Sequence, residues 1–304
     1  MPTLEPGCAY RILGEAVDAA SPIVIDSPHS FRDWPGHGTP TIAPEEALLT
    51  SWDAWVDELW AEASAGMAPT LAAGFHRAYI DANRARDDID PQLLDSAWPE
   101  PLRPTPKSRA GMGLIRRLAL PGVPLYDRLL SVDDVRSRIA HCYDPYHRAL
   151  SRLVDAAHAR FGLSCHIDCH SMKSIGNAMN EDSGRPRPDI VVSDLGGMSA
   201  SPLLVRWFAS NFGDLGYRVQ VNEPYRGAEL IRRHGDPSNS RHSVQVEINR
   251  ALYMDERRFV RNDGYGALAS SLATLFGRLV AALAGDLGDQ LRDSTRRSRR
   301  VMTP

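Results

Sequence analysis

The sequence predicts an α/β protein whose sheet is largely parallel. Short runs rich in β-branched residues recur along the chain, and longer segments with helical spacing of apolar residues lie between several of them. The chain has 304 residues, of which 43% are hydrophobic and 24% are charged. This size and composition suit one large globular core and argue against a disordered or disulfide-dense chain. We therefore expect a single α/β domain over residues 1–290.

Six short apolar runs are predicted to be the strands of this domain, because each is rich in β-branched side chains and bounded by polar or turn-forming residues. In chain order they are Ile23–Ile25, Ala78–Ile80, Ser164–Ile167, Ile190–Val192, Val219–Val221 and Val244–Ile248.

Four longer segments are predicted to be helices, because their apolar residues recur with helical spacing. Ser131, with Asp134 three residues later, is expected to cap the second of them, and Pro145 is expected to kink or divide it. The four segments are Pro44–Ala65, Val132–Phe161, Pro202–Leu215 and Tyr265–Leu287.

Two segments lack such patterns. Residues 90–124 are rich in Pro, Arg and Gly without periodicity, so we expect a long loop excursion, of a length that is often functional in compact domains. The segment 291–304 carries five arginines from Arg292 onward and is expected to be a basic, solvated tail.

The charged residues argue against nucleic-acid binding and show a surplus of arginine. With 35 basic and 38 acidic residues the formal net charge is −3, so the chain lacks the positive field that holds nucleic acid. Only Lys107 and Lys173 among the basic residues are lysines, which leaves 33 arginines, the side chain best suited to bidentate carboxylate binding.

Location is predicted from the cysteines and from the absence of targeting patterns. Four cysteines without CxxC spacing and an N-terminus without a signal-peptide pattern favour the cytoplasm. The apolar stretch Gly266–Gly285 keeps its leucines at helical spacing and is interrupted by polar residues, so we expect a core helix and no membrane partner. The oligomeric state stays open.

Polar residues follow three of the predicted strands, where ligands bind in open α/β sheets. His29 and His170 are two such residues, and their imidazoles could share a divalent metal while Asp168 orients a ligand from behind. A third ligand is expected to be Asp53 or Asp57, which are four residues apart on one face of a predicted helix, although a solvated acidic face would show the same pattern.

Other polar residues suggest a reaction and an anionic ligand. In the run SVQVEIN, strand alternation places Glu247 opposite the apolar residues, which fits either a general base or a buried ion pair. Arg84, Arg226 and Arg233 fit a carboxylate-binding site or a solvated basic face. Cys169 is disfavoured as a nucleophile, because alternation points it away from its polar neighbours.

Six motifs, in this order, resemble the N-formylglutamate amidohydrolase family over about residues 20–256. They are SPHS at 27–30, the DAWVDELW helix, DANR at 81–84, DCHS at 168–171, YRGAELIRRHG at 225–235 and VEINRALYMDE at 246–256. The resemblance implies a zinc-carboxypeptidase-like fold, with a mixed, mostly parallel sheet between two helical layers, and hydrolysis of N-formyl-L-glutamate to formate and L-glutamate.

The resemblance also implies roles for individual residues. His29 and His170 match ligands of zinc or another divalent metal, Asp168 supports them, and Glu247 matches the glutamate that activates water. Relatives carry HxxE where this chain has Arg32, so we expect Asp53 rather than Asp57 as the third ligand.

The substrate is expected to be a small anionic N-acyl amino acid. Asn83 and Arg84 match a pair that binds the substrate carboxylate or polarises its carbonyl, and we expect Arg226 and Arg233 to hold the glutamate carboxylates. The alternatives are a deacylase for another N-acyl amino acid or peptide-like substrate, and a non-catalytic protein that binds acidic metabolites.

Overall fold

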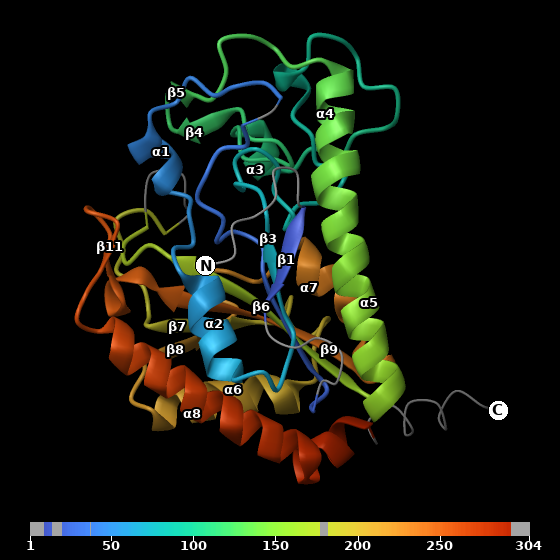
Figure 1. The fold of residues 1–304 in the computed structure, drawn as a ribbon, viewed down its shortest axis with the longest axis vertical. Coiled ribbons are helices and arrows are strands. Elements are labelled where there is room, and N and C mark those ends of the chain that lie inside the picture. Colours follow the sequence, from blue (N-terminus) through green and yellow to red (C-terminus); the bar gives the residue numbers. More distant parts are fainter. Residues whose placement is uncertain (1–8, 14–19, 37, 177–181, 293–304) are drawn as a thin grey trace, which may run out of the picture.

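A mixed sheet of seven strands forms the centre of the computed structural model, which describes residues 9–13, 20–36, 38–176 and 182–292 (Figure 1). The strand order is β1-β3-β2-β6-β9-β7-β8. The four strands from β3 to β9 are parallel, β1 and β7 run antiparallel to their inner neighbours, and β8 is parallel to β7. The bounds are β1 Tyr10–Leu13, β2 Ile23–Ser27, β3 Thr70–Ala73, β6 Ser164–Met172, β7 Ile190–Ser193, β8 Val219–Val221 and β9 Arg241–Asn249.

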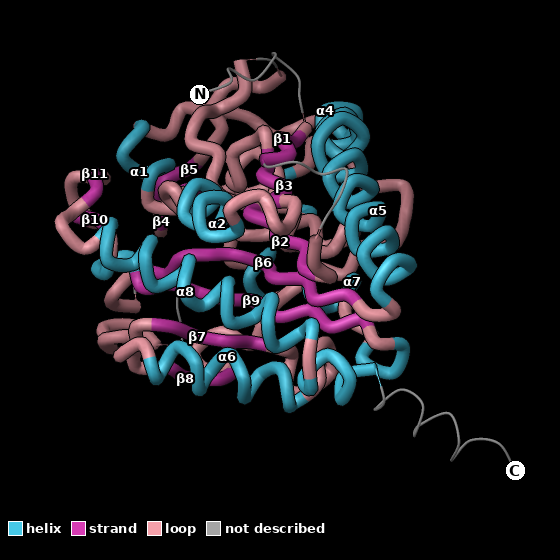
Figure 2. The backbone as a smooth tube through the Cα atoms, turned by 60° about the horizontal axis from the view of Figure 1, so that its bottom comes forward, coloured by secondary structure: helices cyan, strands magenta, loops and turns pink. Residues whose placement is uncertain are grey.

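Helices cover both faces of the sheet, which confirms the predicted α/β class and the three-layer arrangement that the resemblance implies. One layer consists of α2 (Val56–Ser64), α6 (Pro202–Asp214) and α8 (Tyr265–Ala284), whose apolar side chains share a core with the sheet. The other contains α4 (Val132–Arg138), α5 (Asp144–Phe161) and α7 (Glu229–His234). The views in Figures 1 and 2 place α5 and α8 on opposite sides of the strands.

The central strand β6 has one apolar and one polar face, and both are buried. Cys165, Ile167 and Cys169 belong to the core shared with α2 and α8. His166, Asp168 and His170 alternate with them and project from the opposite face, where burial is equally complete. The neighbouring strand β9 repeats this division, since Val244, Val246 and Ile248 lie in the same apolar core, as the sequence predicted. The polar face must therefore satisfy its charges internally.

The prediction of a strand at Ala78–Ile80 was wrong. These residues form a buried turn, in which the Tyr79 amide donates to His76 O at 2.9 Å. The strand of this region is β3, a few residues earlier, whose sequence TLAA has only one β-branched residue and so carried little strand signal. The other five predicted strands are confirmed, and β6 extends beyond its predicted end through the DCHS motif.

The continuous helix predicted over Pro44–Ala65 was also wrong. The structure has α1 (Glu45–Leu49) and α2, separated by a turn in which Trp55 adopts the left-handed conformation with φ 55°. A bulky side chain is strained in this conformation, so contacts with the surrounding structure must impose the break in the helix. Asp53 lies in the break and Asp57 in α2, and they therefore do not share one helix face as predicted.

The helix predicted over Val132–Phe161 forms without a sharp division. Ser131 caps α4 through the Asp134 amide at 3.1 Å, as predicted, and a π-helical turn, η2 (Ile139–Tyr143), joins α4 to α5. Pro145 lies in the first turn of α5. The wider π-helical turn just before it accommodates the proline ring and the missing N–H.

The segment 90–124 contains short elements, namely η1 (Pro91–Leu93), α3 (Pro106–Arg109), β4 (Leu118–Leu120) and β5 (Val123–Pro124). Its Leu114 and Ile115 are fully buried. Elsewhere the chain forms η3 (Pro237–Asn239), η4 (Arg250–Leu252), β10 (Met254–Asp255) and β11 (Val260–Arg261). Of the basic tail predicted at 291–304, residues 293–304 lie outside the described residues.

α8 is long and apolar enough to cross a membrane by length and composition. Its leucines, including Leu268, Leu272 and Leu279, are nevertheless buried in the core that it shares with α2, as predicted from their spacing. The described part of α8 therefore behaves as a core helix.

Arg138 joins α4 to two other segments and provides a test of this packing. Its guanidinium donates to Tyr79 O at 3.1 Å and to Tyr126 Oη at 2.7 Å, and it pairs with Asp134 at 2.8 Å. We expect Arg138→Gln to lower the free energy of unfolding by about 3 kcal/mol, because it removes a buried, hydrogen-bonded charge. Urea unfolding measures this change. Exposed Arg136 on the same helix is the matched control, and Arg136→Gln should change stability by less than about 0.5 kcal/mol.

Candidate metal centre and active-site cavity

The loop after β2 carries His29 and is fastened to the turn that carries Asp53. The Asp53 amide donates to His29 O at 3.0 Å, and Trp52 Nε1 donates to Ser30 O at 2.7 Å. Ser30 Oγ in turn lies 2.5 Å from Ser27 Oγ at the end of β2. These contacts bring the break between α1 and α2 against the carboxyl end of the sheet and fix the position of Asp53.

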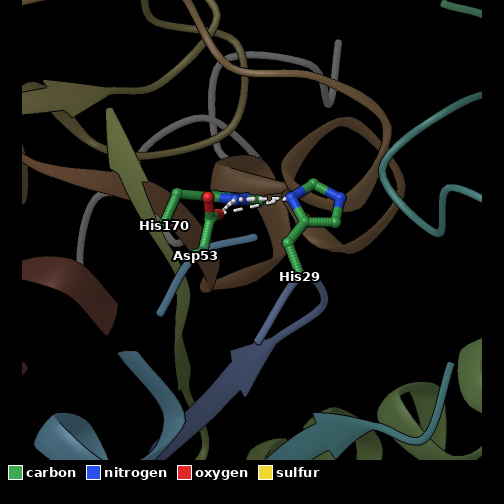
Figure 3. Close-up of side chains that lie close together, drawn as sticks. All are labelled: His29, Asp53 and His170. Atoms are coloured by element: carbon green, nitrogen blue, oxygen red, sulfur yellow. Dashed lines mark hydrogen bonds and ion pairs between the residues drawn. The ribbon is translucent and has the colours of Figure 1, made fainter. Parts of the chain in front are cut away.

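His29, Asp53 and His170 converge on one point (Figure 3). The two Nδ1 atoms are 3.0 Å apart, and Asp53 Oδ2 lies 3.1 Å from His170 Nδ1 and 3.5 Å from His29 Nδ1. All three side chains are at least 97% buried. Residue spacing left the choice between Asp53 and Asp57 open and the family resemblance favoured Asp53. It is Asp53 that lies with the histidines, whereas Asp57 pairs with Arg11 at 2.7 Å.

A carboxylate faces the far nitrogen of each imidazole. His29 Nε2 lies 2.7 Å from Asp81 Oδ1, and His170 Nε2 lies 2.7 Å from Asp168 Oδ1. An acid at Nε2 favours a proton there and leaves the Nδ1 lone pair for a cation. Two such lone pairs and a carboxylate oxygen, all within 4.8 Å of one another, suit a divalent metal with two imidazole ligands and one carboxylate ligand.

Arginines neutralise the acids of this centre. Asp53 Oδ1 accepts from Arg250 Nη2 at 3.0 Å, and Asp81 Oδ2 accepts from Arg77 Nη2 at 2.8 Å. Burial alone would raise the pKa of Asp53, but its contacts with His170 and His29 and the charge of Arg250 hold it well below its usual range. Burial opposes Arg77 and His29 in the same way at Asp81, whose pKa is also well below the ordinary value. Both acids are therefore anionic at neutral pH.

The two histidines differ in charge when only the protein groups are considered. Burial and the nearby Arg77 lower the pKa of His29, so its ring is neutral. Burial would also lower the pKa of His170, but Asp168 and Asp53 outweigh it and raise the pKa well above 6.5. Without a metal, one proton is thus held mainly by His170, and a metal must displace it.

Asn83 contacts His170 at its Nε2 atom, on the side of the ring opposite the converging Nδ1 atoms. Its Nδ2 lies 3.1 Å from Asp168 Oδ2, 3.0 Å from His170 Nε2 and 3.3 Å from Gln245 Oε1, while its Oδ1 accepts from the Leu230 amide at 2.9 Å. In this arrangement the buried amide connects β6, β9 and the start of α7.

Glu247 lies beside the metal centre on the polar face of the sheet. It is the register partner of His170 between the parallel strands β9 and β6, and its Oε1 accepts from Gln245 Nε2 at 3.0 Å. Among the described residues its Oε2 makes no hydrogen bond. Burial raises the pKa of Glu247, although His170 and Arg77 oppose this, so its carboxylate accepts a proton more readily than an exposed glutamate.

A cavity of about 120 Å³ extends from Asp53. Five cationic side chains line it, together with Tyr225, whose phenol stays neutral because burial and Glu247 raise its pKa. The cations are Arg77, Arg116, Lys173, Arg187 and Arg250, and the remaining lining residues are Thr50, Ser51, Met112, Ala119, Leu120, Ser171 and Met172. The lining of the cavity is therefore predominantly cationic, with a small apolar wall.

The arginines predicted from the sequence are not among the residues that line this cavity. Arg226 and Arg233 are exposed and do not line this cavity, and the Arg84 guanidinium donates to Met112 O at 3.2 Å and to Asn83 O at 3.0 Å. The sequence did not single out the cavity arginines. Only Arg250 carried a signal, because it follows the Glu247 strand, where the site was expected.

Comparisons with known proteins identify the family of this chain. A sequence model of the N-formylglutamate amidohydrolase family matches residues 21–254. The chain is 30% identical over 239 residues to N-formylglutamate deformylase from Pseudomonas aeruginosa, covering 78% of this chain and 83% of the relative. It is 26% identical over 238 residues to N-formylglutamate deformylase from Pseudomonas putida, covering 77% and 82%.

Solved structures show the same fold. The crystal structure of N-formylglutamate amidohydrolase from Ralstonia eutropha JMP134 superposes with a TM-score of 0.85 at 38% identity, over 90% of this chain and 98% of the other. The gene product Atu2144 from Agrobacterium tumefaciens superposes with a TM-score of 0.64 at 16% identity, over 92% and 98% of the two chains, which shows a shared fold.

The choice of Asp53 over Asp57 can be tested by metal binding. We expect Asp53→Asn to weaken Zn²⁺ binding by roughly 100-fold or more, because a neutral amide replaces the only carboxylate among the three converging groups. Asp57→Asn is the matched control and should bind Zn²⁺ like the wild type. Competition with a chromophoric chelator measures both affinities, and equal losses in the two variants would contradict the assignment.

Proton release accompanies metal binding if His170 holds a proton in the metal-free protein. Because the pKa of His170 is raised well above 6.5, this proton is present at pH 7 and must leave when the metal binds. Apparent Zn²⁺ affinity should therefore fall by up to about tenfold per pH unit as pH decreases from 8 to 6. Calorimetry in buffers of different ionisation enthalpy counts the protons released. Affinity independent of pH would show that the site binds metal from a deprotonated state.

Proposed function

The chain belongs to the N-formylglutamate amidohydrolase family, and we propose that it hydrolyses N-formyl-L-glutamate to formate and L-glutamate. Water adds to the formyl carbon, the C–N bond breaks, and the amine leaves with a proton. One observation supports this most strongly: His29, Asp53 and His170 converge on one point, and Asp53 also lines a cavity whose wall carries five cationic side chains. A metal centre beside an anion site is what hydrolysis of an acidic N-acyl amino acid requires.

We propose zinc as the metal, held by His29, His170 and Asp53. Two imidazoles and one carboxylate are a ligand set found in catalytic zinc sites, which keep a further position open. When bound, such a metal lowers the pKa of water towards about 7 and polarises a carbonyl group. Asp81 and Asp168 would fix the two imidazoles, and Arg250 would hold Asp53 in place.

Glu247 is the proposed general base. Its raised pKa and its Oε2 atom, which makes no hydrogen bond to the residues that the structure describes, suit removal of a proton from the attacking water and its later delivery to the departing amine. Gln245 holds the other oxygen and so orients the carboxylate. The anionic charge on Glu247 is supported by Arg77, which also lies close enough to lower its pKa.

The substrate carboxylates are proposed to bind the cations of the cavity, in place of the arginines expected from the sequence. Arg77, Arg187 and Arg250 line the cavity, whereas Arg226 and Arg233 do not. Asn83 and Arg84 act indirectly in this proposal. Asn83 supports Asp168 and His170, and Arg84 joins the DANR turn to the carbonyl of Met112 in the cavity wall.

The location and pathway form part of the same proposal. Cys142, Cys165 and Cys169 are buried free thiols, which fits a reducing cytoplasm. The product L-glutamate is consistent with a role in amino-acid degradation, including that of histidine.

A substrate panel tests the proposed reaction. Zinc-loaded protein should release formate and L-glutamate from N-formyl-L-glutamate, at a kcat/KM well above that for N-acetyl-L-glutamate or for other N-formyl amino acids. Chelation of the metal should abolish turnover, and added zinc should restore it. Activity on another acyl group alone would indicate a related deacylase, and stoichiometric metal without turnover on any member of the panel would indicate a binding protein.

The role of Glu247 predicts a separation between metal binding and turnover. Glu247→Gln should lower kcat by about 10³-fold or more, because the amide cannot accept a proton, while the bound zinc stays at one equivalent per chain. Glu62→Gln on the exposed side of α2 is the control and should retain wild-type kcat. Steady-state kinetics and elemental analysis give the two readouts, and wild-type turnover by Glu247→Gln would remove Glu247 as the base.

A further inference from the structure

Most of the arginines around the cavity already have a carboxylate partner. Arg77 pairs with Asp81 at 2.8 Å, Arg250 with Asp53 at 3.0 Å and Arg187 with Asp182 at 2.6 Å. Each of these guanidiniums is neutralised by an acid of the protein itself. They can still donate a hydrogen bond to a ligand, but they do not require one for charge balance.

Arg116 is different from these three. It is 7% exposed, and the nearest carboxylate oxygen, Asp81 Oδ2, is 3.9 Å from its Nη2. That oxygen already accepts from Arg77, and the other oxygen of Asp81 contacts His29 and the Asn83 amide. The Arg116 side chain makes no hydrogen bond within the described ranges, and its Nε is buried without a partner. A buried guanidinium without hydrogen-bond partners destabilises the fold unless an anion binds to it.

Electrostatics point in the same direction. Burial and the positive charge of Arg77 lower the pKa of Arg116 to about 9, and Asp81 opposes them only in part. An arginine remains protonated at neutral pH even so. The charge is therefore present and under-compensated, at the wall of a cavity that Asp53 also lines.

The backbone holds Arg116 rigidly in this place. Met112 and Arg116 form an isolated antiparallel bridge, the Leu114 amide donates to Asp88 O at 2.8 Å, and Leu114 O accepts from the Asp81 amide at 2.8 Å. Gly113 allows this close approach, since a Cβ there would lie 2.6 Å from Asp88 O. The turn is thus fastened to the segment that carries Asp81, and Arg116 has little freedom to move away.

We propose that Arg116 is the specificity-determining residue of the cavity and binds the side-chain carboxylate of a dicarboxylic N-acyl amino acid. This inference rests on the proposed function, which it extends by naming the group that distinguishes glutamate from uncharged side chains. Met112, Ala119 and Leu120 line the same wall and provide an apolar surface for the methylene groups of such a side chain. Arg116 and these three residues all come from the excursion at 90–124, which therefore selects the substrate.

Lys173 is the competing candidate among the cations of the cavity. It is only partly buried, and although burial and Arg250 lower its pKa, the carboxylate of Glu256 opposes them. Glu256 also accepts from the Ser174 amide at 3.0 Å, so an acid of the protein lies next to Lys173. Its need for an external anion is smaller than that of Arg116.

The test compares zinc-loaded wild-type enzyme with Arg116→Gln, Arg116→Lys, Lys173→Met and Arg226→Gln on N-formyl-L-glutamate and N-formyl-L-glutamine. These substrates differ only in the charge of the side-chain terminus. Arg116→Gln should lower kcat/KM for the glutamate substrate by about 100-fold and change that for the glutamine substrate by less than about threefold. Arg116→Lys should recover part of the preference. Arg206→Gln, an exposed change on α6 across the sheet, is the control and should leave both values unchanged.

Stability separates this role from a structural one. Removal of an under-compensated buried charge should leave Tm of Arg116→Gln unchanged or raise it, whereas loss of a structural arginine would lower it. A lowered Tm together with equal losses on both substrates would overturn the inference. Retention of the preference by Arg116→Gln, or its loss in Lys173→Met or Arg226→Gln instead, would also overturn it.

Binding measurements distinguish failure of the inference from failure of the proposed function. Calorimetry with L-glutamate and L-glutamine needs no turnover. If wild-type protein does not hydrolyse N-formyl-L-glutamate but binds L-glutamate in a manner lost in Arg116→Gln, the proposed reaction is wrong and the dicarboxylate site stands. If L-glutamate binds equally well to both proteins, or to neither, the assignment of Arg116 is wrong whatever the reaction.

Discussion

The site depends on the contact between a buried carboxylate and the Nε2 atom of each histidine. Asp81 and Asp168 are 2.7 Å from His29 and His170, and these contacts turn both Nδ1 atoms towards each other and towards Asp53. Either imidazole with its proton on Nδ1 would present a donor where a metal requires a lone pair. The acids are set by the backbone, since Asp168 lies two residues before His170 on the rigid central strand and Asp81 lies in the turn clasped by Leu114.

Such contacts place several carboxylates on one buried face of the sheet. Arginine side chains balance part of this negative charge. Asp53 and Asp81 each have a guanidinium partner. Farther from the metal centre the same face contains Asp26, which accepts from Tyr146 Oη at 2.6 Å and contacts His166 Nε2 at 2.8 Å. Part of the high arginine content thus balances buried acids, although many of the arginines are exposed. The arginines that contribute to the site pair with buried acids, and Arg116 is proposed to pair with a ligand.

The sequence predicted what depends on local pattern. Apolar runs located five of the seven strands of the sheet, polar residues after strands pointed to His29 and His170, and strand alternation pointed to Glu247. It failed where tertiary contacts decide. Asp53 and Asp57 were indistinguishable by spacing, because the left-handed Trp55 that separates them has no local signature. Arg77, Arg116 and Arg187 were missed for a similar reason. Each lies in a loop without periodicity, and only the fold brings them around one cavity.

The proposed reaction and the proposed substrate selectivity likewise belong to different parts of the fold. Groups that act on the amide bond lie on β6 and β9 or are fastened to strand ends, where a shift of one residue would turn His170 and Glu247 into the apolar core. They are hard to alter without loss of the fold. The wall from 90–124 is attached by backbone hydrogen bonds and can change its side chains without disturbing the sheet. Selectivity for the substrate side chain can therefore vary there while the reaction stays the same.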